Sequence, residues 1–247
     1  MHQYYDEIIR NTKREDALVI IQRLKESIGK MFSFLNYFRE IPVSYAAKLL
    51  NVENEMAEFE VHEYQAKVIS VERKTLIFPQ RSSSLQDDVC AEAFYVSSEK
   101  KRVILCNFSY ARIWSNQRRF VRVRLEKSIS ADVILDTGVL QGNVIDISLG
   151  GAAITFMSKE SLVPNCVLNL SLKLPDISNG PVVNVALTAS VVRVHGEEPP
   201  YLCIFEFHPE KHSQRQIAYF ANRRQVEIIK ELKEFKNLTK FSLSPPQ

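Results

Sequence analysis

The sequence lacks the long apolar segments that would place a protein in a membrane. Its 247 residues contain no run of about 18 apolar residues, so we expect no transmembrane helix and no membrane insertion. The first residues, MHQYYDEIIRN, have neither the basic nor the apolar region of a secretory signal peptide. We therefore expect a cytoplasmic protein.

Cysteine pairs and catalytic motifs are also missing. The four cysteines are far apart and form no CxxC pair, which favours buried thiols in a reducing compartment: Cys90, Cys106, Cys166 and Cys203. The sequence contains no GxSxG, Walker or HExxH motif. We accordingly expect no enzymatic activity, no cofactor and no metal site.

A strong overall charge is absent as well, but one segment is distinctly basic. The formal net charge is only +3, so any anion site must be local. From Lys100 to Leu125 there are eight lysines and arginines and no acidic residue. Four arginines of this segment fall within seven residues, in the stretch SNQRRFVRVRLEKSIS.

Apolar spacing predicts helices at the two ends and strands between them. Residues 5–37 read as mainly helical, with Thr12 and Glu15 as a capping box. The period changes to two from residue 41, with strands expected over 57–62, 66–79 and 101–113. A second β-rich region covers 120–207, and its first two expected strands are 120–125 and 131–136. A last helix is predicted over 213–238, with Ser213 and Gln216 as its capping box.

The predicted fold is therefore mainly β, with two small β-barrel domains in tandem, an N-terminal helix and a C-terminal helix. The expected boundaries are an N-terminal helical segment (1–37), a β-barrel-like domain (38–113), a basic interdomain linker (114–119), a second β-barrel (120–212), a C-terminal helix (213–238) and a flexible tail (239–247).

The arginine cluster lies where the second barrel is expected to begin. Alternation in FVRVRL predicts Val121, Val123 and Leu125 in the core, and Arg122 and Arg124 on the outer face. The preceding Arg118 and Arg119 can fold over that face, and Arg118 with Arg122 is the pair best placed to close on one ligand. Guanidinium groups bind phosphate in a bidentate manner and stack on aromatic rings.

A second motif, DISLGG, directly follows a predicted strand. Asp146 and Ser148 can bond to the local backbone and hold a turn. We expect Gly150 and Gly151 to allow a positive φ and a close approach of a ligand to the main chain. The aspartate carboxylate can also accept hydrogen bonds from a guanine edge.

Together the two motifs resemble the signature of PilZ domains, bacterial receptors for cyclic di-GMP. RRFVR matches the RxxxR pattern and DISLGG matches DxSxxG, and the resemblance extends over about 116–209. It implies a six-stranded barrel that binds cyclic di-GMP through Arg118, Arg122, Asp146, Ser148 and Gly151, supported by Gln117, Arg119, Arg124 and Gly150. Gln117 stands where many members carry an arginine. The sequence therefore leaves open whether the site binds one or two ligand molecules.

The layout of two barrels is similar to PilZ proteins of the YcgR flagellar-brake type. This resemblance implies a receptor that changes its domain arrangement on binding and regulates motility or surface behaviour. The expected partners are cyclic di-GMP and a protein that the sequence does not identify, such as the flagellar motor or other output machinery. The alternatives are a nucleic-acid-binding β-barrel, disfavoured because few aromatic residues interleave the arginines, and a degenerate PilZ scaffold that binds only protein.

Overall fold

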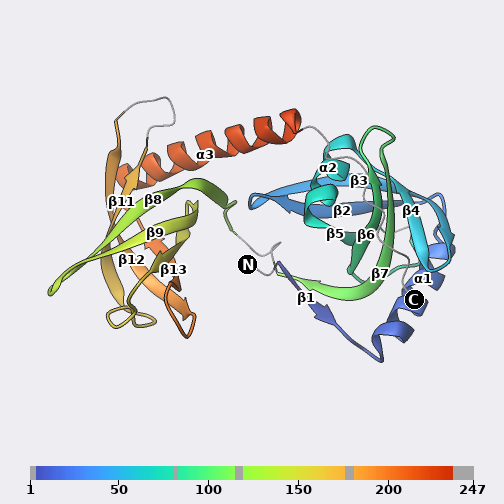
Figure 1. The fold of residues 1–247 in the computed structure, drawn as a ribbon, viewed down its shortest axis with the longest axis horizontal. Helices are drawn as coiled ribbons and strands as arrows, with labels where there is room; N and C mark the ends of the chain where they lie inside the picture. Colours follow the sequence, from blue (N-terminus) through green and yellow to red (C-terminus); the bar gives the residue numbers. More distant parts are fainter. Residues whose placement is uncertain (1–3, 81–82, 115–118, 176–180, 236–247) are drawn as a thin grey trace. The chain divides into compact units, whose positions relative to one another are not determined.

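The computed structural model describes residues 4–80, 83–114, 119–175 and 181–235 (Figure 1). The chain forms two compact units. The first contains the described parts of 1–38, 42–118 and 230–247, and the second contains 39–41 and 119–229. The domain boundaries expected from the sequence stay predictions.

The first unit is built on a seven-stranded sheet with the order β1-β7-β4-β3-β2-β5-β6. β7 also pairs with β6, so that all strands except β1 close into a barrel. The strands are β1 (Tyr5–Ile8), β2 (Met31–Phe38), β3 (Ile41–Glu53), β4 (Met56–Glu60), β5 (Lys74–Pro79), β6 (Val89–Ser97) and β7 (Arg102–Ile113). Helix α1 (Lys13–Lys25) packs against β7, and α2 (Glu63–Glu72) packs against β2.

The prediction of one long helix over 5–37 is wrong at both ends, where the structure has the strands β1 and β2. Only α1 is helical there, and its predicted capping box of Thr12 and Glu15 is confirmed. The helix ends at Lys25, and Gly29, with a φ of 84°, turns the chain before β2 begins. In β2, the fully buried Phe32 and Phe34 are two residues apart, which is the spacing of a strand facing a core.

The prediction for one strand of the first unit is also partly wrong. The sequence predicts a strand over 66–79, but its first part belongs to α2 and only β5 is extended. Arg73 separates the two elements in the left-handed conformation, with a φ of 62°. The apolar run AKVIS fits both a buried helix and a strand, so spacing alone does not decide between them.

The second unit is a closed barrel with the strand order β10-β13-β12-β11-β8-β9. Its strands are β8 (Val123–Leu135), β9 (Gly138–Ser148), β10 (Gly151–Phe156), β11 (Val167–Leu174), β12 (Val183–His195) and β13 (Tyr201–His208), followed by α3 (Lys211–Glu234). In β12, alternate residues from Val185 to Val191 are buried. The prediction of a mainly β fold with two barrels, an N-terminal helix and a C-terminal helix is confirmed.

The start of this barrel differs from the expectation in detail. β8 is one long strand that begins at Val123, where the sequence suggests two strands over 120–136. Val123 is buried as predicted, but Val121 precedes the strand and is 42% exposed, so its expected place in the core is wrong. Leu125 is half-buried.

The C-terminal helix begins before its predicted capping box. α3 starts at Lys211, so Ser213 lies inside the helix. The Ser213 hydroxyl donates a hydrogen bond to the Ala186 carbonyl oxygen (2.8 Å), which ties the helix to β12. The serine therefore holds the helix to the barrel and does not cap it.

Candidate functional site

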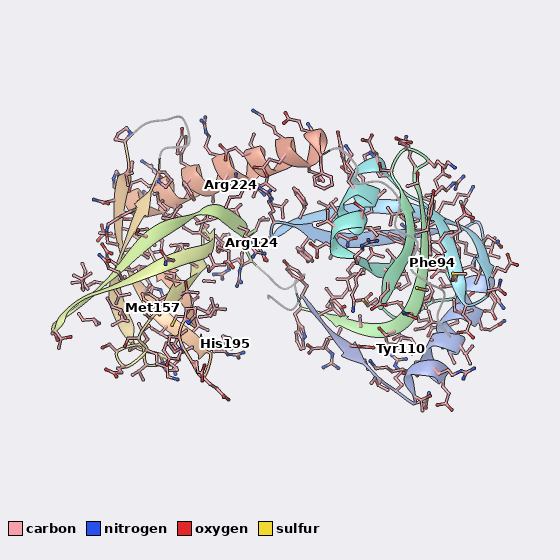
Figure 2. All side chains as sticks on the ribbon, in the orientation of Figure 1. Phe94, Tyr110, Arg124, Met157, His195 and Arg224 are labelled. Atoms are coloured by element: carbon pink, nitrogen blue, oxygen red, sulfur yellow. The ribbon has the colours of Figure 1, made fainter. Side chains whose placement is uncertain are left out.

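The arginine segment and the DISLGG turn are neighbours in the second barrel. β8 pairs with β9 so that Val123 lies opposite Ile147, and Arg124 lies opposite Asp146. Residues directly opposite one another in an antiparallel pair share a face, with their Cβ atoms about 5 Å apart. Because Val123 and Ile147 are buried in the core, Arg124 and Asp146 lie on the outer face; Figure 2 labels Arg124 near the start of β8.

A β-bulge at Ile145 determines which way the aspartate points. Against β10, the register advances from Val144 to Asp146 on β9 while it moves by only one residue on β10. Val144 and Ile147 are both buried in the barrel although their positions differ by three, an odd number. Strict alternation from Val144 would point Asp146 inward, so the bulge brings Asp146 and Ser148 to the outer face.

Both polar side chains of the motif are well covered even though they face outward. Asp146 is 1% exposed and Ser148 is 6% exposed. A carboxylate shielded from water interacts more strongly with a charged or N–H donor than one in open solvent. Asp146 is therefore suited to recognise a specific donor group.

Hydrogen bonds hold the turn between β9 and β10. Ser148 lies opposite Gly151, and the Ser148 hydroxyl donates to the Gly151 carbonyl oxygen (3.1 Å). The Phe207 N–H of β13 donates to the Gly150 carbonyl oxygen (3.0 Å). The turn is thus fixed to β13 as well as to its own hairpin.

The two glycines of the motif are needed for packing. A Cβ on Gly151 would lie 2.1 Å from the Phe205 carbonyl oxygen, so the β13 backbone excludes any side chain. A Cβ on Gly150 would lie 2.8 Å from the Phe120 ring. The expected positive φ is wrong, because neither glycine adopts the left-handed region. Their role is to permit close approach by β13 and by Phe120.

The contact of Phe120 brings the arginine segment onto the turn. Phe120 lies within RRFVR, between Arg119 and Arg122, and its ring packs on Gly150. Arg119 is exposed and Arg122 is half-buried. The expected ligand residue Arg118 and the supporting Gln117 lie outside the described residues. The described members of the predicted site therefore gather at one end of the barrel.

Comparison with protein families identifies this region. The family model for the PilZ domain matches residues 116–222, which contain both motifs and the barrel that joins them. Residues 116–222 therefore match the PilZ domain. None of the curated proteins matches the chain significantly.

Three solved structures of low sequence identity are similar to this chain. The Bacillus subtilis inhibitor of motility MotI/DgrA is 14% identical, with 81% of this chain and 97% of that chain covered and a TM-score of 0.41. Escherichia coli YcgR in complex with c-di-GMP is 11% identical, with 94% and 96% covered and a TM-score of 0.42. The K. pneumonia MrkH–c-di-GMP complex is 17% identical, with 94% and 100% covered and a TM-score of 0.40.

The sequence patterns did not predict one connection inside the second unit. Arg224 of α3 is only 9% exposed and forms ion pairs with Glu126 of β8 (3.6 Å) and with Glu227 (3.0 Å). Figure 2 labels Arg224 on the helix. Since Glu126 is two residues from Arg124, this contact links α3 to the arginine strand. The apolar stripe of α3 is interrupted by Arg224, and that interruption is the signal in the sequence.

Other functional features are limited in the part of the chain that the structure describes. No cluster of three histidine, cysteine or acidic side chains there could hold a metal ion. All four cysteines are free, and Cys90, Cys106 and Cys203 are buried. None of the helices in the described ranges combines the length and the apolar character of a membrane span.

Proposed function

We propose that the chain is a bacterial receptor for cyclic di-GMP that acts through its PilZ domain. The observation that carries the proposal is the register of Arg124 opposite Asp146, since the strand that directly follows the RxxxR pattern lies beside the DxSxxG turn. The family match to residues 116–222 supports the same assignment. The proposal assigns no catalysed reaction and no cofactor.

The proposed ligand contacts follow from the chemistry of the residues. Cyclic di-GMP carries two phosphate charges, and Arg118 and Arg122 are proposed to bind them and to stack on a guanine. Asp146 is proposed to accept hydrogen bonds from the N1–H and N2–H of a guanine, since its carboxylate is shielded and faces the outer side. Ser148 and Gly151 shape the turn, and Arg119 and Arg124 add positive charge.

Binding is further proposed to change the arrangement of the two barrels and so to control a protein partner. Such a change requires that the ligand bind one arrangement more tightly than the other. A tenfold preference corresponds to about 1.4 kcal/mol, which one charge-assisted hydrogen bond can supply. The proposed output is motility or surface behaviour, through the flagellar motor or other machinery, in the cytoplasm.

Calorimetric titration of the full chain with cyclic di-GMP tests the receptor function. We expect a dissociation constant of about 1 µM or lower, which corresponds to about −8 kcal/mol. Arg122→Ala is expected to weaken binding at least tenfold without a change in thermal stability, because the side chain is only half-buried. The matched control is Arg215→Ala, an exposed arginine of α3 outside the site.

Three outcomes would contradict parts of the proposal. A folded protein without measurable heat at high ligand concentration is a PilZ scaffold that acts only through protein contacts. Binding of a duplex DNA with steep salt dependence, abolished by Arg122→Ala, would favour the nucleic-acid alternative. Identical small-angle scattering curves with and without saturating ligand would rule out the change of domain arrangement and leave the receptor function intact.

A further inference from the structure

An apolar groove lies beside α3 in the second unit. It has a volume of about 330 Å³ and lies between the ends of β11 and β12 and the first half of α3. Its lining residues are Leu174, Pro175, Val183 and Val185 from the strands, and His212, Arg215, Gln216, Tyr219 and Phe220 from the helix. None of these belongs to the RxxxR or DxSxxG motifs.

The groove opens to solvent along the helix. Phe220 and Val185 are buried and form its floor, together with the end of β11. Tyr219 is 56% exposed and Val183 is 37% exposed, so an apolar rim remains in contact with water. An exposed aromatic side chain beside an apolar depression is a common anchor point in protein–protein recognition.

The first half of α3, which borders the groove, is basic, and positive charge at this end does not stabilise a helix. From Lys211 to Val226 there are four lysines and arginines, one histidine and no acidic residue. Cations in the first turn of a helix are unfavourable, because the helix dipole is positive there. Within the described residues neither Lys211 nor Arg215 forms an ion pair, and both side chains are exposed. The positive charge at the rim is therefore available to a ligand.

We propose that this groove binds an acidic peptide segment of a partner protein. One large apolar side chain of the segment occupies the depression, and its carboxylates contact Arg215 and His212 at the rim. Nucleic acid is disfavoured because an apolar floor offers nothing to a phosphate backbone. The inference rests on the proposed function, to which it adds the chemistry of the partner, but the groove and the nucleotide site share no residue.

Selection from a random library of 12-residue peptides displayed on phage tests the proposal on the full chain. The enriched sequences are expected to combine several aspartates or glutamates with one leucine, phenylalanine or tryptophan. The strongest peptide is then synthesised with a fluorescent label, and its affinity is measured by polarisation without cyclic di-GMP. Two altered peptides accompany it, one with the apolar residue changed to serine and one with the acids changed to their amides. Each is expected to bind at least tenfold more weakly.

Variants of the protein locate the site. Arg215→Glu and Tyr219→Ser alter exposed side chains and are each expected to weaken binding at least tenfold without a change in melting temperature. The matched control is Lys230→Glu, which makes the same charge change on α3 about 22 Å along the helix and is expected to have little effect.

The outcomes separate this proposal from the receptor function. Selected peptides without acids or an apolar anchor, no selected peptide at all, or equal losses with Arg215→Glu and Lys230→Glu would overturn the peptide site. The peptide site would also be overturned if the peptide does not bind and another ligand binds in an Arg215-dependent manner. The ligands tested are a 20-base-pair DNA and vesicles with anionic lipid. Cyclic di-GMP titration of the Arg215→Glu variant shows separately whether the nucleotide site works.

Discussion

The closest packing in the proposed nucleotide site is at Gly151, and Gly151→Ala is a direct test of it. The added Cβ would lie 2.1 Å from the Phe205 carbonyl oxygen. An unstrained carbon–oxygen contact is about 3.3 Å, so the backbones of β10 and β13 must separate by roughly 1 Å. The barrel is closed and neither strand can move alone. We expect a loss of about 3 kcal/mol in the free energy of unfolding.

The neighbouring Gly150→Ala is the matched comparison. Its added Cβ would meet the Phe120 ring at 2.8 Å, and this ring is 37% exposed and can turn outward. We expect a loss below about 1 kcal/mol, because only a side chain must move. The displaced Phe120 would no longer hold the arginine segment on the turn, so the affinity for cyclic di-GMP is expected to fall at least threefold.

Calorimetric melting of the two variants measures their stability, and calorimetric titration measures their affinity for cyclic di-GMP. Gly151→Ala is expected to lower the melting temperature of the second unit by about 10 °C, and Gly150→Ala by less than about 4 °C. The wild-type chain is the reference for both measurements. If Gly151→Ala melts within about 2 °C of the wild type, or if Gly150→Ala is the more destabilised of the two, the packing explanation for the motif is refuted.

Three further predictions concern single positions. Val123→Asp is expected to destabilise the second barrel by more than about 3 kcal/mol in urea unfolding, whereas Val121→Asp changes stability by less than about 0.5 kcal/mol, because only Val123 is buried. Burial raises the pKa of the Cys203 thiol to about 11, so the folded protein should leave Cys203 unlabelled by iodoacetamide at pH 8, and rapid labelling in the native state would contradict this. The hydrogen bonds that Arg10 donates lower the pKa of the Asp87 carboxyl, so this pair stabilises the protein above the ordinary aspartate pKa and loses that effect as the pH falls. The stability difference between wild type and Asp87→Asn, below about 1 kcal/mol for so exposed a pair, should therefore shrink from pH 6 to pH 3, and a growing difference would show the opposite linkage.

Strand alternation and short motifs predicted much of the second unit. In β12 and β13 the apolar residues alternate, and the structure buries them as expected. The DISLGG turn follows its strand as predicted, and Asp146 and Ser148 lie beside the arginine strand. These features are determined by residues that are close together in the sequence, so the spacing of apolar residues predicts them well.

The errors arose where distant parts of the chain decide the local structure. Met31–Phe38 reads as a continuation of a helix until its partner β5 is known, since Phe32 and Leu35 also fit helical spacing. Ser213 fits a helix cap but bonds to β12. The contact of Phe120 with Gly150 joins residues from two motifs, and neither motif alone contains a signal for it.

The bulge at Ile145 has a consequence for how this region tolerates evolutionary change. Side chains on β9 can be exchanged without altering which face they occupy, but loss of one residue between Val144 and Asp146 would reverse the inside–outside parity of the strand end. Asp146 and Ser148 would then enter the barrel, and Ile147 would replace them outside. Natural variation in this hairpin should therefore consist of substitutions, whereas single-residue insertions and deletions here should be eliminated by selection.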